Sequence, residues 1–242
     1  MTTRTATTSP LVYARLAGLL LLIVAVISAF SIIYVPSTLI VPGDATATAD
    51  NIGASGGLFQ LGIVSDSLIF LAEIAVTVLL YVLLRPVSRM LSLVAAFARL
   101  AMSVIMGINL LPYFVALLLV SGAGYLTVFE PAQSDALALL FLNVHQDVVY
   151  IWQLFFGFHL AVLGYLIYKS GYFPRILGVV MVVAALGYLT DAYGNMLYAN
   201  YDETFGWIVG VTAIVGELPF FLWLLIRGVN VQEWHKRASR SA

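Results

Sequence analysis

Six long apolar stretches, separated by short polar segments, dominate the pattern of hydrophobic and polar positions along the chain. Each stretch has the roughly 20 residues that an α-helix needs to cross the hydrocarbon core of a bilayer. The predicted spans are residues 13–34, 58–84, 90–120, 147–168, 176–198 and 205–226. The pattern therefore predicts an all-α fold, a polytopic transmembrane helical bundle.

Three segments need a more detailed interpretation. The third span is unusually long, and we expect it to tilt or to kink at Pro112. Residues 133–145 contain an apolar run that is too short to cross the bilayer, and we interpret them as an interfacial helix leading into the fourth span. One long kinked helix is the alternative. Residues 35–57 are predicted to form a polar loop.

The first span has a competing interpretation as a signal peptide, because Arg4 and Arg15 precede an apolar run. That run is longer than the apolar region of a usual signal peptide and lacks a clear cleavage site of small residues. We therefore favour a retained span. At this length one helical bundle is the natural unit, so residues 1–242 are expected to form a single integral membrane domain.

Basic residues predict the orientation of the bundle. With the N-terminus in the cytoplasm, all but one of the 11 Lys and Arg residues fall in cytoplasmic segments, which is the positive-inside pattern. Both termini are therefore predicted to be cytoplasmic. The predicted outer segments carry only acidic charges: Asp44, Asp50, Glu130, Asp135, Asp147, Asp202 and Glu203.

The composition agrees with a membrane protein: 62% of the residues are hydrophobic, 10% are charged, and the mean hydropathy is +1.02. Soluble domains are nearer half apolar and a quarter charged, so the lipid bilayer is the expected partner. The net charge of −1 gives no electrostatic case for nucleic acid. The absence of cysteine excludes thiolate catalysis and zinc–sulfur sites. The sequence does not indicate an oligomeric state.

Ionisable residues within the spans carry the functional information, because a charge at the bilayer centre costs about 2.5–3.5 kcal/mol. A rise of about 1.5 Å per residue predicts which of them share a depth. Near the middle we expect a candidate polar cluster of Glu73, Arg99, His159 and Glu217. Nearer the outside we expect a candidate vestibule of Asp66, Asn109, Asp191 and Asn195. Arg99 is expected to neutralise one or both glutamates; a purely structural role for the cluster is the alternative.

No metal site and no cofactor are expected. His145 and His159 are fourteen residues apart, which matches no local ligand motif, and His235 lies in the predicted cytoplasmic tail. Nucleophile elbows, phosphate-binding loops and dinucleotide fingerprints are missing, so no catalytic residue is identified.

Several sequence blocks, spread over nearly the whole chain, resemble a known family. The longest runs from Gly164 to Gly178 and reads GYLIYKSGYFPRILG, and others are FFGFH at 155–159 and VPGD at 41–44. In these blocks the chain is similar to the bacterial multi-pass membrane proteins of domain-of-unknown-function family 4386. The resemblance implies a protein of the bacterial cytoplasmic (inner) membrane, the plasma membrane, without an assigned activity. Arg99, His159 and Glu217 stand at positions that look like the family's pattern.

Three functions fit these features. The first is a protein that binds or moves a small solute, a cation or a proton through the buried Glu/Arg/His cluster. The second is an intramembrane enzyme acting on a lipid or isoprenoid, with Glu73 or Glu217 as general acid. The third is a non-catalytic component of a membrane assembly. The sequence leans against an enzyme without deciding the question.

Overall fold

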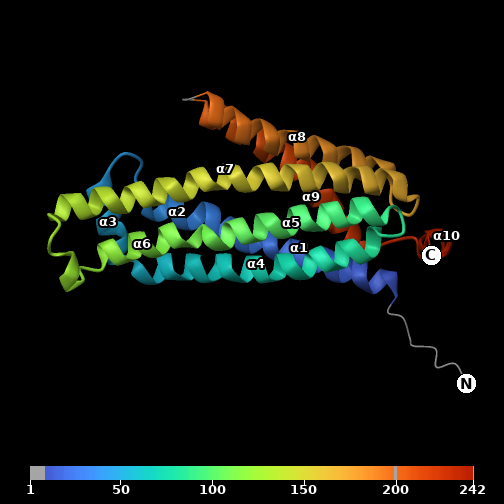
Figure 1. The fold of residues 1–242 in the computed structure, drawn as a ribbon, viewed down its shortest axis with the longest axis horizontal. Helices are drawn as coiled ribbons and strands as arrows, with labels where there is room; N and C mark the ends of the chain where they lie inside the picture. Colours follow the sequence, from blue (N-terminus) through green and yellow to red (C-terminus); the bar gives the residue numbers. More distant parts are fainter. Residues whose placement is uncertain (1–8, 199–200, 242) are drawn as a thin grey trace, which may run out of the picture. The chain divides into compact units, whose positions relative to one another are not determined.

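The computed structural model describes residues 9–198 and 201–241, and within these ranges the regular structure is entirely helical (Figure 1). In this part of the chain six helical stretches are long and apolar enough to cross a membrane, which confirms the predicted all-α multi-pass architecture. They are Pro10–Leu39, Gly56–Leu84, Arg89–Val120, Pro131–Ser170, Arg175–Leu197 and Asp202–Ile226. The cytoplasmic location of the termini stays a prediction, and Arg4, one of the residues that support it, lies outside the described residues.

The first stretch is built from three consecutive elements. Helix α1 (Pro10–Ser28) continues through the π-helix η1 (Ala29–Tyr34) into the short α2 (Val35–Leu39). The prediction of a polar loop over residues 35–57 is wrong in part, because helix α3 (Ala45–Ala54) lies within it. The Asp44 carboxylate caps α3 by accepting a hydrogen bond from the Ala47 N–H at 2.9 Å.

The long third stretch is interrupted, but not at the residue expected. Helix α4 (Gly56–Leu84) is followed by α5 (Arg89–Ile108) and α6 (Leu110–Val120), and the break lies at Asn109, not at Pro112. Proline has no N–H and clashes with the carbonyl four residues earlier, so the disturbance appears one turn before the proline itself.

Residues 131–170 form one helix. The short 3₁₀ helix η2 (Gly124–Leu126) leads to α7 (Pro131–Ser170), so the interfacial helix expected at 133–145 is the N-terminal part of a 40-residue helix. This is the alternative that the sequence left open. Pro131 stands at the first helical position, where it is well tolerated, and no proline follows until after α7 ends.

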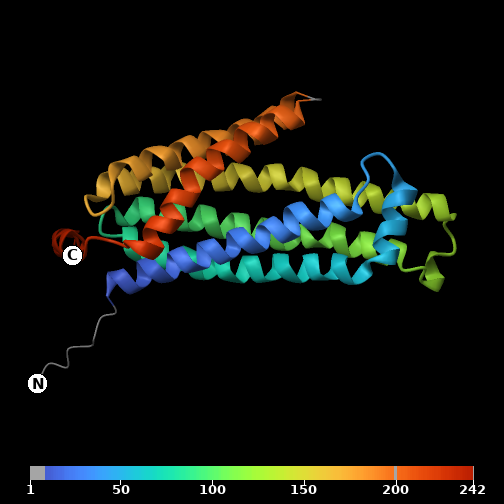
Figure 2. The ribbon, with the colours of Figure 1, turned by 180° about the vertical axis from the view of Figure 1, so that it is seen from behind.

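The C-terminal third contains α8 (Arg175–Leu197), α9 (Asp202–Ile226) and the short α10 (Val231–Ser241). Helices α8 and α9 pack along one another (Figure 2). Tyr172, in the turn between α7 and α8, donates a hydrogen bond of 2.7 Å to the Leu83 carbonyl at the end of α4. The Trp234 Nε1–H of α10 donates to the same carbonyl at 2.9 Å.

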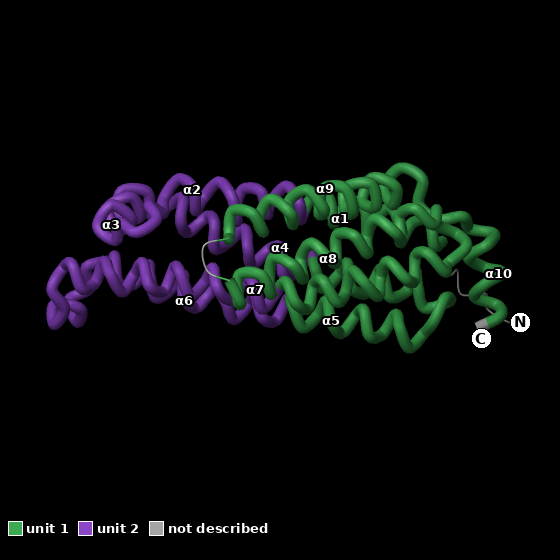
Figure 3. The backbone as a smooth tube through the Cα atoms, turned by 90° about the horizontal axis from the view of Figure 1, so that it is seen from above, with its two compact units in different colours: residues 1–23, 73–102, 153–242 green, residues 24–72, 103–152 purple. Residues whose placement is uncertain are grey.

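The chain divides into two compact units (Figure 3). Unit 1 contains residues 1–23, 73–102 and 153–242, and unit 2 contains residues 24–72 and 103–152. Unit 2 has an apolar core cluster made of Val35, Leu39, Ile52, Phe59, Ile63, Tyr113, Ala116, Ala138 and Leu142. The expectation of a single domain stays a prediction.

Candidate functional site

A buried ion pair joins helices α4 and α5 in unit 1. Arg99 on α5 contacts Glu73 on α4, with 2.6 Å between Arg99 Nη2 and Glu73 Oε2. Arg99 is 2% exposed and Glu73 is 7% exposed, so both charges are withdrawn from the surface. Removing one partner of such a pair leaves the other charge buried and uncompensated, which is strongly destabilising.

His159 on α7 joins the ion pair, and the geometry fixes its protonation. Arg99 Nη1 lies 3.0 Å from His159 Nε2, and His159 Nδ1 lies 2.8 Å from the Ala95 carbonyl. A guanidinium can only donate, so Nε2 is the accepting nitrogen. A carbonyl can only accept, so the proton is on Nδ1. His159 is therefore neutral, and Arg99 is the single fixed cation of this group.

An aromatic ring covers this arrangement from one side. The Arg99 guanidinium lies 5.8 Å from the centroid of Phe156, a range in which cation–π attraction operates. The Phe156 ring also stacks near His159, with centroids 6.1 Å apart, and meets Tyr188 edge-on at 4.8 Å. Phe156 thus links the ion pair on α4 and α5 to helix α8.

The second glutamate has a different partner. Tyr188 on α8 donates a hydrogen bond of 2.8 Å to Glu217 Oε1 on α9. Glu217 is also close enough to Arg99 and Glu73 to interact with both electrostatically. It is only half-buried, whereas Glu73, Arg99 and His159 are buried. The structure thus brings the four residues of the candidate polar cluster together in unit 1 and adds Tyr188.

Two glycines make the Tyr188–Glu217 contact possible. A Cβ at Gly187 would overlap the Thr212 side chain, and a Cβ at Gly216 would lie 2.6 Å from the Val180 carbonyl oxygen. Each glycine immediately precedes one partner of the hydrogen bond in the sequence. Small residues allow two helix backbones to approach closely, so these positions fix the separation of α8 and α9.

A polar row continues along α8 from Tyr188. Asp191 is buried, and its two carboxylate oxygens accept hydrogen bonds from Gln153 Nε2 at 2.7 Å and Asn195 Nδ2 at 2.9 Å. Residues 188, 191 and 195 follow the helical repeat and share one face of α8. Tyr188 also interacts electrostatically with Asp191, so the row leads from Asn195 toward Glu217.

The residues of the candidate outer vestibule are divided between the two units. Asp191 and Asn195 belong to unit 1, whereas Asp66 and Asn109 belong to unit 2. Asp66 is buried beside Ser31, and Asn109 is bonded to the backbone of His145 at 2.9 Å. Each pair is therefore described within its own unit, and the vestibule of all four residues stays a prediction.

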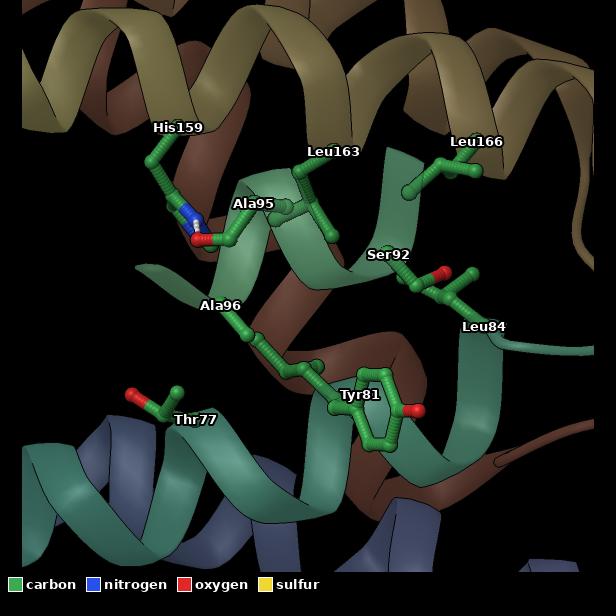
Figure 4. A pocket seen from close by; sticks show the side chains of 10 residues that line it. Thr77, Tyr81, Leu84, Ser92, Ala95, Ala96, His159, Leu163 and Leu166 are labelled. Atoms are coloured by element: carbon green, nitrogen blue, oxygen red, sulfur yellow. Dashed lines mark hydrogen bonds between the residues drawn. The ribbon is translucent and has the colours of Figure 1, made fainter. Parts of the chain in front are cut away.

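A small void lies next to His159 in unit 1 (Figure 4). Its volume is about 10 Å³, about the size of one water molecule. Thr77 and Tyr81 of α4, Ser92 and Ala95 of α5, and Leu163 of α7 are among the lining residues. The void beside the cluster can hold a water molecule, which can carry a proton, and it is too small for an organic solute.

Sequence reasoning missed Tyr188, Phe156 and Gln153. Tyr188 and Gln153 carry no charge, so the cost of burying a charge did not indicate them, and Phe156 looks like any apolar span residue. The available signal was spacing, because Tyr188 stands three residues before Asp191 and shares its helix face. Among the described residues, no group of three His, Asp or Glu side chains is arranged to hold a metal ion.

Comparison with known proteins identifies a family but no activity. The family model described as "Domain of unknown function (DUF4386)" matches residues 16–228. A protein of the archaeon Archaeoglobus fulgidus is 31% identical over 171 residues, which cover 71% of this chain and 86% of that protein. It carries only the name "Uncharacterized protein", and its archaeal source shows that this similarity is not restricted to bacteria. No solved structure matches the chain.

Proposed function

Because this chain belongs to the DUF4386 family, whose description assigns no activity, we propose its function from geometry: it binds a proton at Glu217 and moves it across the membrane. The observation that carries the proposal is the charge balance of the cluster. Glu73 and Glu217 face a single fixed cation, Arg99, while His159 is neutral by its hydrogen bonds.

The surplus negative charge requires a counter-charge. An uncompensated carboxylate in apolar surroundings is so costly that it takes up a proton instead. Glu73 forms the direct ion pair at 2.6 Å and is the ionised partner. Glu217, held by a neutral phenol, is therefore the group that gains and loses the proton.

The polar row on α8 supplies a path to Glu217. Asp191 and Tyr188 offer an ionisable group and a hydroxyl group one helical turn apart, and Tyr188 contacts Glu217 directly. Asn195 lies two residues before the end of α8 at Leu197. With both termini in the cytoplasm, as the basic residues predict, this end of α8 faces the outside of the cytoplasmic membrane.

Proton flux into proteoliposomes tests the proposal. Vesicles with an internal pH dye would be given a potassium diffusion potential, and the initial rate of acidification would be compared with that of empty vesicles. Wild type should exceed empty vesicles, and Glu217→Gln should reduce the excess at least about tenfold. Glu233→Gln, which removes an exposed carboxylate on α10, is the matched control and should retain the rate. Flux by wild type no greater than that of empty vesicles would refute the proposal.

The partial exposure of Glu217 favours a second candidate, an enzyme acting on a lipid or isoprenoid. The neighbouring residues Ile214, Val215 and Leu218 on α9 are exposed and apolar, so an acyl or isoprenoid chain could reach a protonated Glu217 from the bilayer. Lipid extracts from membranes containing wild type or Glu217→Gln would be compared by mass spectrometry. A product that depends on Glu217, together with absent proton flux, would favour the enzyme.

A further inference from the structure

Unit 2 contains a buried polar layer that the proposed function does not use. It consists of Ser31, Asp66, Asn109 and His145, each at most 6% exposed. Each lies three or four residues along its helix from a member of the apolar core cluster, namely Val35, Ile63, Tyr113 and Leu142. Since three to four residues make one helical turn, the polar residues share the faces that build the core and form the next layer of it.

Asp66 brings a negative charge into this layer without a basic partner. Asp66 is 2% exposed, and Ser31 and Tyr113, which lie near its carboxylate, carry no positive charge. Among the described residues, the Ser31 hydroxyl has no hydrogen-bond partner. Residues 24–72 and 103–152 contain no Lys or Arg, so no fixed cation of unit 2 can compensate it. A buried carboxylate without a counter-charge is strongly disfavoured, and a bound cation would remove that cost.

Asn109 presents a fixed oxygen without a partner. Its Nδ2 donates to the His145 carbonyl at 2.9 Å, and His145 Nδ1 donates back to the Asn109 carbonyl at 2.7 Å. The Tyr113 ring stacks on His145 with centroids 3.6 Å apart and holds the pair in place. In the described part of the chain, Asn109 Oδ1 has no hydrogen-bond partner, although the residue is 1% exposed.

Two of the contributing helices are irregular at these residues. Ser31 stands within the π-helix η1, and Asn109 stands at the break between α5 and α6. Pro112 has no N–H to offer the Ile108 carbonyl beside Asn109. Interrupted helices in membrane proteins free backbone carbonyls that coordinate monovalent cations, and π-turns are frequent at functional sites.

We propose that this layer binds a sodium ion between the Asp66 carboxylate, the Ser31 hydroxyl and Asn109 Oδ1, with the Tyr113 hydroxyl beside them. The donor set is all oxygen, which suits a hard cation. One carboxylate balances one positive charge, whereas calcium sites use several carboxylates among six to eight oxygens. The acidic residues of unit 2 would also raise the local concentration of cations.

Binding of radioactive sodium to the purified protein tests the proposal directly. The protein would be prepared in detergent with choline chloride as the only salt, and ²²Na⁺ would be titrated at constant ionic strength. Wild type should bind saturably, and potassium should compete at least about ten times less well than sodium. Asp66→Asn should weaken binding at least about tenfold, while Asp147→Asn, an exposed carboxylate on α7, should leave it unchanged.

Two further variants keep the result interpretable. Ser31→Ala removes one neutral ligand and should weaken sodium binding about tenfold. It tests the site even if Asp66→Asn fails to fold. Glu217→Gln should bind sodium like wild type, so failure of the proton proposal and failure of the sodium proposal are distinguishable. The absence of saturable binding, equal competition by potassium, or an equal loss in Asp147→Asn would overturn the sodium site. In that case protonation of Asp66, and not a bound cation, would remove the buried negative charge.

Discussion

Arg99 donates a hydrogen bond to an unprotonated imidazole nitrogen, with 3.0 Å between its Nη1 and His159 Nε2. The same guanidinium forms the ion pair with Glu73 and lies over Phe156. Arg99 therefore makes contacts in three directions, which suits a planar fork of donors and would not suit a lysine ammonium. Glu217, in contrast, accepts its hydrogen bond from the neutral phenol of Tyr188 and not from a cation.

Arg99→Lys should destabilise the protein although it keeps the charge. The ammonium cannot bond to Glu73 and His159 in the same geometry, and the stacking on Phe156 is lost. We expect the free energy of unfolding to fall by about 2 kcal/mol, the scale of a charge-assisted hydrogen bond. Denaturation with SDS in mixed micelles measures it. Arg175→Lys, at an exposed position, should change stability by less than about 0.5 kcal/mol.

The two glutamates should respond differently to the same substitution. Glu73→Gln leaves the Arg99 charge buried without its partner and should cost about 3 kcal/mol of unfolding free energy. Glu217→Gln replaces a protonated carboxyl by an amide that can still accept from Tyr188, so its cost should stay within about 1 kcal/mol. Equal losses in the two variants would show that the charges are not distributed as described.

Gly216→Ala should separate α8 from α9. The added Cβ would lie 2.6 Å from the Val180 carbonyl oxygen, and overpacking of this kind costs about 1–3 kcal/mol. The matched control is Gly210→Ala on the same helix, where a Cβ meets open space. That control should leave the melting temperature unchanged or raise it, because alanine favours helix more than glycine does.

Tyr172→Phe should change the dependence of stability on alkaline pH. Burial raises the pKa of the Tyr172 phenol, and the nearby Arg237 opposes this only in part. The unfolded phenol ionises near pH 10 while the folded phenol keeps its proton, so the unfolded state binds fewer protons and the unfolding free energy falls as pH rises above about 10. Unfolding measured between pH 8 and about 11 should show a shallower decline in the variant. An unchanged slope would contradict the role given to burial.

The length of the apolar stretches was sufficient to predict six spans, and the cost of burying a charge was the reason to expect the candidate polar cluster. The α4 and α8 boundaries differ from the predicted spans by at most two residues, because Pro86 and Pro174 terminate the pattern clearly. Glu73, Arg99 and His159 were expected together because each is too costly to face lipid alone. The cap of α3 at Asp44 was visible in the sequence as an aspartate before a run of alanine and threonine, but it was interpreted as loop.

Other features depend on packing that no single stretch of sequence encodes. The continuity of α7 was hidden because its polar N-terminal part looks unlike a span, although it contains no helix-breaking residue after Pro131. The hydrogen bond between Tyr188 and Glu217 depends on how closely α8 and α9 approach at Gly187 and Gly216. Asp66 and Asn109 belong to unit 2 and Asp191 belongs to unit 1, and this division depends on which helix segments pack together, which depth alone does not determine.

The exchangeable proton that we propose for Glu217 can be measured directly by infrared difference spectroscopy of the protein in lipid. Wild type should show a C=O stretching band of a protonated carboxylic acid that rises and falls with pH. The band should be lost in Glu217→Gln and kept in the surface control Glu233→Gln. A band that persists undiminished in Glu217→Gln, or its absence from wild type at every pH, would contradict the account.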